Sequence, residues 1–143
     1  EVRAATTAEG MTSSTRSTEK QKAGLRYEKR VLTEIAKLGT LTKTPWIDYL
    51  DDDGWHKCQP DGILWAGGAP FILEMKLRQN WQGYEELQWL YLPVMQRYLR
   101  QPVRGLLVCN VLQSKMQDWL FLGPQASVGD LPEGKIGTWF FRA

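Results

Sequence analysis

The chain has little cysteine, little histidine and no long apolar run, and each shortage excludes a class of protein. Its 143 residues include 2 cysteines and 1 histidine, too few for a disulfide framework or for a zinc site made of Cys and His alone. No run of about 18 apolar residues is present, and no apolar signal-peptide core opens the sequence. We therefore expect an intracellular, cytoplasmic protein without a membrane span.

Net charge is also small, because 18 basic and 16 acidic residues leave only +2. No basic field covers the whole molecule, so charge alone does not indicate nucleic-acid binding. The distribution is uneven, with nine basic and five acidic residues before position 44 and an acidic stretch over residues 48–61. An acidic pocket beside basic flanks would suit a metal site that also binds a polyanion, although a solvated surface of mixed charge has the same pattern.

The remaining composition is that of a globular protein, and the chain divides into an arm and one domain. Hydrophobic residues make up 43% of it, which is ordinary. Residues 1–17 are rich in Ala, Thr and Ser without an apolar period, which predicts a flexible N-terminal arm. Residues 18–143 predict a single domain. It opens with a helix over residues 18–38, where Thr18 begins a capping box and Gly39 favours a stop.

Alternating and continuous apolar stretches predict the strands, which cover residues 46–50, 57–65, 71–77, 104–111, 119–122 and 138–141. A second helix is predicted over residues 83–99. It contains Pro93, which lacks an N–H group and predicts a kink near Trp89 or a later start of the helix. Helix, three strands, helix and strand in this order predict an α/β fold with a mixed sheet.

The third predicted strand carries the first candidate residues for chemistry. Side chains alternate along a strand, so Glu74 and Lys76 share one face while Met75 belongs to the apolar face. A surface salt bridge explains such a pair, and so does a bound ligand. Asp61 follows Pro60 on the neighbouring strand and is expected beside Glu74. Two adjacent carboxylates repel each other, and a cation would relieve that repulsion.

A third acidic residue is predicted on the buried side of the first helix. Val31, Leu32 and Ile35 lie three, four and seven residues after Glu28, so all four are expected on one stripe. A core-facing glutamate needs a partner. Metal coordination is one explanation, and pairing with an Arg or Lys is the other.

Further candidates lie on the two helices and after the third strand. Gln88 and Tyr91 are three residues apart and would share a helix face, where they either serve a site or belong to the core. Basic and aromatic residues that could contact nucleic acid, or simply form a solvated surface, are Lys20, Lys22, Arg26, Lys29, Arg30, Arg78 and Trp81.

Four motifs resemble, in chain order, those of the PD-(D/E)XK nuclease superfamily: Gly24-x-x-x-Glu28, Pro60-Asp61, Glu74-Met75-Lys76 and Gln88-x-x-Tyr91. The resemblance covers roughly residues 20–112 and implies a restriction-endonuclease-like core (αβββαβ), with a mixed central sheet flanked by helices. The small size resembles archaeal and phage Holliday-junction resolvases. The last motif is similar instead to the RecB-like and lambda-type exonuclease branch.

The resemblance also implies a mechanism. It assigns the binding of a Mg²⁺ or Mn²⁺ ion to Asp61, Glu74, the backbone carbonyl of Met75 and Glu28. Lys76 is expected to orient or deprotonate the attacking water and to stabilise charge in the transition state. Gln88 and Tyr91 are expected to help position that lysine and the phosphate.

These implications predict a metal-dependent, structure-specific DNA endonuclease that acts on branched DNA in recombination or repair. A homodimer would match the two-fold symmetry of a four-way junction, and a phage source is one of those that the resemblance allows. The alternatives are an exonuclease or general DNA nuclease of the RecB or lambda type, a restriction endonuclease, and a noncatalytic DNA-binding module.

Overall fold

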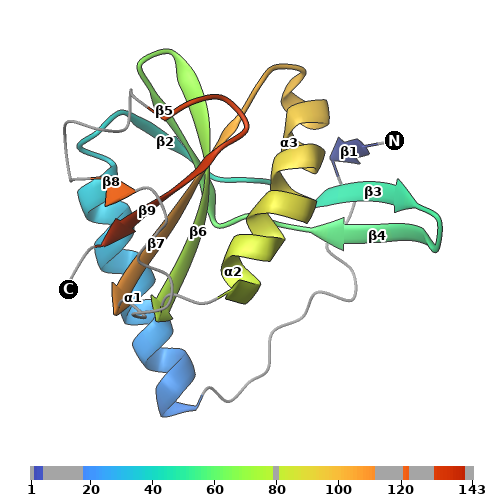
Figure 1. Cartoon of the computed structure of the whole chain (residues 1–143). Coiled ribbons are helices and arrows are strands. Elements are labelled where there is room, and N and C mark those ends of the chain that lie inside the picture. The colour runs from blue at the N-terminus through green and yellow to red at the C-terminus, as the bar shows by residue number, and fades with distance from the viewer. Residues whose placement is uncertain (1, 5–17, 79–80, 112–120, 123–130, 141–143) are drawn as a thin grey trace.

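A six-stranded mixed sheet forms the centre of the protein (Figure 1). The computed structural model describes residues 2–4, 18–78, 81–111, 121–122 and 131–140. In sheet order the strands are β2 (Thr40–Thr42), β5 (Gly62–Ala66), β6 (Ala69–Arg78), β7 (Arg104–Val111), β9 (Ile136–Phe140) and β8 (Phe121–Leu122). The pairs on the β2 side of β6 are antiparallel and those on its β7 side are parallel. The predicted α/β fold with a mixed sheet is confirmed.

The helix α1 (Glu19–Ile35) covers one face of this sheet. Its capping box is formed as predicted, since the Gln21 N–H donates to the Thr18 hydroxyl at 3.1 Å. Tyr27, Val31 and Ile35 are buried on its inner face against side chains of β5, β6 and β7. The helix begins and ends close to its predicted limits.

Gly39 has a different role from the one predicted, because α1 ends at Ile35 with Ala36 as its C-cap. A Cβ atom at position 39 would lie 2.1 Å from the carbonyl oxygen of Trp65. Glycine therefore allows the backbone before β2 to approach the end of β5 closely.

The second predicted helix consists of three continuous segments, namely α2 (Trp81–Glu85), the π-helical η1 (Glu86–Tyr91) and α3 (Leu92–Leu99). The N–H of Leu92 donates to the carbonyl of Leu87, five residues earlier, which defines the wider π turn. This turn contains Trp89 and ends just before Pro93, which has no N–H group to continue an α-helical ladder. The π turn therefore lies in the part of the helix where Pro93 predicts a kink.

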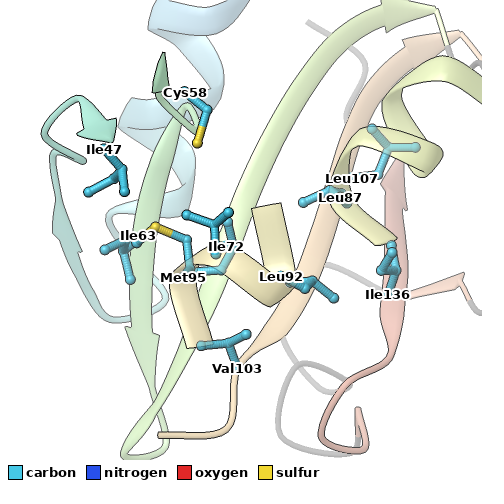
Figure 2. Packing of buried hydrophobic residues seen from close by; sticks show 11 residues of the cluster. Ile47, Cys58, Ile63, Ile72, Leu87, Leu92, Met95, Val103, Leu107 and Ile136 are labelled. Carbon is cyan, nitrogen blue, oxygen red and sulfur yellow. The ribbon is translucent and has the colours of Figure 1, made fainter. Parts of the chain in front are cut away.

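These three segments cover the opposite face of the sheet from α1. Figure 2 shows Leu87, Leu92 and Met95 of the helical segments in one apolar cluster with Ile72 of β6 and Leu107 of β7. Each face of the sheet thus has its own core cluster. Among the described residues, no helix has the length and apolar character that crossing a membrane requires.

The predicted strand over residues 57–65 is wrong as a single strand. It is divided between β4 (Gly54–Cys58) and β5, which belong to different sheets. Pro60 lies in the gap, where its missing N–H group interrupts a ladder. Strand β3 (Ile47–Asp51), predicted as the first strand of the core, pairs with β4 in a hairpin outside the central sheet. The short β2 pairs with β5 in its place.

The predicted N-terminal arm includes a strand, β1 (Val2–Ala4), which pairs with β3. Arg3 donates to the Asp48 carboxylate at 3.4 Å, and its guanidinium lies 4.2 Å from the centre of the Trp55 ring. Residues 5–17, like 119–120 and 141 of the last two predicted strands, lie outside the described residues. A strand of three residues is too short to produce a detectable apolar period.

Candidate active site

The candidate site lies at the point where β5 ends its pairing and β6 continues. The last β5–β6 pair is Gly62 with Leu73, and the Asp61 N–H donates to the Leu73 carbonyl at 3.1 Å. From Glu74 onward, β6 pairs only with β7 among the described strands. The Asp61 side chain then replaces the next backbone hydrogen bond between the two strands, since its Oδ2 accepts from the Met75 N–H at 2.7 Å. Pro60 places this aspartate by ending the preceding strand, as argued above.

Glu74 and Lys76 project from the same face of β6, as predicted. Leu73 and Met75 belong to the apolar cluster under α1, whereas Ile72 faces the other cluster (Figure 2). The Lys76 Nζ lies 3.5 Å from the Glu74 Oε1. Glu74 is only 5% exposed, so its carboxyl group is buried and depends on these few polar neighbours.

Asp61 joins the acidic side chains, because its carboxyl group hydrogen-bonds to those of both Glu74 and Glu28. Burial, followed by the charge of Asp61, raises the pKa of Glu74 to about 9, against the opposing effect of Lys76. Burial also raises the pKa of Asp61, although the Met75 hydrogen bond opposes that shift. A hydrogen bond between two carboxyl groups requires a proton on one of them. The cluster therefore favours a bound proton or a bound cation over fully ionised carboxylates.

Glu28 reaches the cluster from α1, on the other side of the sheet. Its side chain is half-buried, and burial and the neighbouring Asp61 raise its pKa. None of the ion pairs among the described residues involves Glu28. Of the two explanations for a core-facing glutamate, an ion pair with an Arg or Lys is thus not observed within the described part of the chain, although the charge of Lys76 acts to lower the pKa of Glu28. Metal coordination stays a prediction.

Tyr91 faces the cluster and Gln88 does not. Burial and then the charges of Glu74, Glu86 and Asp61 raise the pKa of the Tyr91 hydroxyl. Gln88 instead lines a hollow on the outer side of the helix. The expectation that the two share a face assumes α-helical geometry, in which residues three apart are neighbours. The π turn, with its i to i+5 bonding, rotates them apart.

Glu86 is a further acidic residue at the site, and it is not among the site residues predicted from the sequence. Its charge raises the pKa values of both Glu74 and Tyr91. In an α-helix, Glu86 and Tyr91 would lie on different faces because they are five residues apart. The π turn brings them to the same side. Pro93, which disfavours a regular helix here, is the one signal that could have indicated this.

Several residues that were predicted to contact nucleic acid lie together on one exposed face of α1, namely Lys22, Arg26, Lys29 and Arg30. Lys22 lies 3.6 Å from Glu19. The other three make no ion pair with any described residue. The side chains of the remaining candidates lie outside the described part of the structure, namely Lys20, Arg78 and Trp81.

Comparison with family models, curated proteins and solved structures found no match to the chain.

The donor set has the chemistry that a hard divalent cation prefers. Asp61 and Glu74 offer carboxylate oxygens, and the Met75 carbonyl faces the same open edge as its N–H, because both groups of a strand residue point one way. No three Asp, Glu, His or Cys side chains within the described ranges form a ready-made metal cage. Mg²⁺ characteristically uses one or two carboxylates together with water and substrate phosphate. The donors therefore fit Mg²⁺ or Mn²⁺ better than a cation that needs a complete protein cage.

Proposed function

We propose that the protein is a Mg²⁺- or Mn²⁺-dependent deoxyribonuclease that hydrolyses phosphodiester bonds. The observation that carries this proposal is the meeting of Asp61, Glu74 and Lys76 at the open edge of β6. We also propose a restriction-endonuclease-like core. Its support is the order α1, β2, β5, β6, second helix and β7, which has the expected αβββαβ sequence once the β3–β4 hairpin is set aside.

In this mechanism the carboxylates of Asp61 and Glu74 and the carbonyl of Met75 would hold the cation, and Glu28, whose carboxyl group lies beside Asp61, would support it directly or through water. The cation would supply Lewis-acid stabilisation of the phosphate charge and would activate a water molecule. Lys76 places an ammonium group beside Glu74. That ammonium can orient the attacking water and stabilise the negative charge that develops on the phosphate.

The proposed substrate is branched DNA, and the proposed form is a homodimer that presents two sites to a symmetric junction. The exposed basic face of α1, which includes Arg26, Lys29 and Arg30, supports contact with phosphates. A RecB-like or lambda-type exonuclease remains the alternative. The position of Gln88 outside the cluster gives that alternative less support.

Cleavage of a defined substrate panel tests the proposal. Asp61→Asn, Glu74→Gln and Lys76→Ala are each expected to reduce cleavage at least about a hundredfold, because each removes a group from the reacting site. DNA binding, measured in EDTA, is expected to change little. The panel contains labelled four-way junction, flap, linear and circular DNA with Mg²⁺ or Mn²⁺.

Matched controls come from exposed residues elsewhere. Asp52→Asn, in the turn between β3 and β4, and Lys43→Ala, before β3, make the same kinds of change at exposed positions. Both are expected to cut at the wild-type rate. Paired symmetric nicks in the junction would support a resolvase, and shortening of linear DNA alone would identify an exonuclease. Wild-type cleavage by the three site variants would refute the proposed site.

A further inference from the structure

The helical segment that contributes Tyr91 to the candidate site also lines two hollows on its other face. On its outer side, two adjoining hollows lie between this segment and the chain before β9. One hollow has a volume of about 450 Å³ and is lined in part by Trp89 and Lys135. The other has a volume of about 340 Å³ and is lined in part by Gln96 and Arg97. Gln88 lines both, and the two adjoining hollows are together called the outer groove here.

The outer groove is positively charged. Lys135 and Arg97 are both exposed, and neither makes an ion pair with any described residue. No acidic residue is among the described residues that line either hollow. Glu133, the nearest acidic residue along the chain to Lys135, is exposed and is not among the lining residues given for either hollow. Two cations with no ion-pair partner among the described residues favour an anionic ligand. The amide groups of Gln88 and Gln96 add hydrogen-bond donors and acceptors along the same depression.

Trp89 gives this groove an aromatic surface. It is 76% exposed, the most exposed of the large hydrophobic side chains that the structure describes. An indole ring beside unpaired cations matches the way proteins bind single-stranded nucleic acid, with bases stacked on aromatic rings and phosphates held by Lys and Arg. A duplex offers no such base faces, since its bases already stack on each other.

We propose that the outer groove binds single-stranded DNA, with a base stacked on Trp89 and phosphates held by Lys135 and Arg97. The choice of DNA rests on the proposed nuclease function, and the proposal adds a substrate class to it: DNA with an unpaired strand. The groove and the carboxyl cluster lie on different sides of the same π turn.

Binding of a fluorescently labelled oligothymidylate, measured by anisotropy in EDTA, tests the groove directly. Trp89→Ala is expected to weaken binding about fivefold to a hundredfold, the range for the loss of one stacked base. Arg97→Ala and Lys135→Ala are each expected to reduce the slope of log affinity against log salt by about 0.7, as expected for one lost phosphate contact with a single strand. A blunt duplex of the same length is expected to bind all of these proteins equally well.

Control variants lie outside the groove. Trp55→Ala removes another exposed tryptophan, 45% exposed on β4, and Lys43→Ala removes another exposed lysine. Both are expected to bind oligothymidylate as the wild type does. An unchanged affinity of Trp89→Ala, or an equal loss for the duplex, would overturn the proposal. Tighter binding of oligouridylate than of oligothymidylate would overturn the assignment to DNA.

Two further results distinguish DNA binding in the outer groove from self-association and from the proposed nuclease function. If Trp89→Ala changes the sedimentation coefficient without changing oligonucleotide affinity, the groove contacts a second copy of the chain, and the proposal is wrong. Because binding is measured without metal, it does not depend on catalysis. A wild-type protein that binds oligothymidylate through Trp89 but cuts none of the DNA panel would support the groove and remove the nuclease assignment.

Discussion

Asp61 has two structural tasks at once, because its N–H makes the last rung between β5 and β6 and its carboxylate makes the next one with the Met75 N–H. The same carboxylate contacts two other acidic groups, Glu28 and Glu74. Any side-chain oxygen at that point could accept from the Met75 N–H. The contact with Glu28 and Glu74, in contrast, raises the energy of the metal-free protein, because buried carboxyl groups repel when they ionise.

Asp61→Asn is therefore expected to stabilise the metal-free protein while it abolishes cleavage. The amide oxygen can still accept from the Met75 N–H, and the amide N–H₂ can donate to the neighbouring carboxylates. We expect the free energy of unfolding in EDTA to rise by about 1 kcal/mol, a typical exchange between stability and activity at a strained site. Urea titration followed by circular dichroism measures it. Asp52→Asn, exposed in a turn, should leave the midpoint unchanged, and a lower midpoint for Asp61→Asn would contradict the prediction.

At the scale of elements, the π turn η1 decides which side chains meet the cluster. It brings Glu86 and Tyr91 towards Glu74 and turns Gln88 to the outer groove. π turns occur often at functional sites, where one additional residue per turn changes the direction of the side chains around it.

Removal of the Tyr91 hydroxyl tests this arrangement. Tyr91→Phe is expected to slow cleavage about tenfold, because the hydroxyl is proposed to position the phosphate and one hydrogen bond to a charged group has an effect of that size. Unfolding in urea should change little, because the ring and its packing remain. Tyr98→Phe is the matched control and should cut normally. Tyr98 lies on α3 and packs against the same apolar cluster as Tyr91. Equal rates for wild type and Tyr91→Phe would show that the hydroxyl has no part in the reaction.

Ion pairs connect the three strands of the sheet of β1, β3 and β4, because an aspartate on the central strand β3 contacts a basic side chain on each outer strand. Asp48 on β3 accepts from Lys57 on β4 at 2.7 Å and from Arg3 on β1 at 3.4 Å. The hydrogen bond from Lys57 is the largest of the effects that lower the pKa of Asp48 from 3.8. Since the folded-state pKa lies below the unfolded-state value, the stabilisation is complete above about pH 4 and is lost as the pH falls through the folded-state pKa.

Asp48→Asn is accordingly expected to lower the melting temperature at about pH 7 and to have a smaller effect at about pH 3, which is below the unfolded-state pKa, so that part of the stabilisation is lost. Thermal melts at the two pH values measure the difference. Asp53→Asn, an exposed aspartate in the adjoining turn, provides the comparison. A destabilisation that is the same at both pH values would show that the charge of Asp48 does not stabilise this sheet.

The parts of the fold that the sequence predicts are those that depend on local pattern. The face shared by Glu74 and Lys76 follows from strand alternation alone, and the start of α1 follows from its cap. Pro60, Asp61 and Gly62 interrupt the apolar pattern of residues 57–65, but the pattern alone does not indicate that the two halves belong to different sheets. The positions of Gln88 and Glu86 depend on a π turn, which shifts the helical period that the prediction assumes.

For the whole molecule, the proton-sharing carboxyl cluster couples folding to cation binding. Bound Mn²⁺ would replace the shared proton and relieve the repulsion among the carboxylates. Binding to the folded state alone raises the melting temperature, by about 5 °C at saturating metal for a domain of this size.

The melting temperature in Mn²⁺ is thus expected to exceed that in EDTA, and Glu74→Gln is expected to remove most of the difference. Differential scanning calorimetry at one protein concentration gives the comparison. Glu34→Gln, an exchange of the same kind far along α1, should keep the full shift. A metal-induced shift that survives in Glu74→Gln would place the cation elsewhere in the molecule.

The bond between the Met75 N–H and Asp61 Oδ2 has one more consequence, for spectroscopy. The proton of a backbone N–H group whose nitrogen lies 2.7 Å from a carboxylate oxygen is strongly deshielded, and its resonance depends on the electron density of that oxygen. Whatever withdraws density from Asp61, be it acid, metal or substrate, should displace this one peak first. A nuclear magnetic resonance spectrum of the ¹⁵N-labelled protein would thus contain its own indicator of what occupies the pocket.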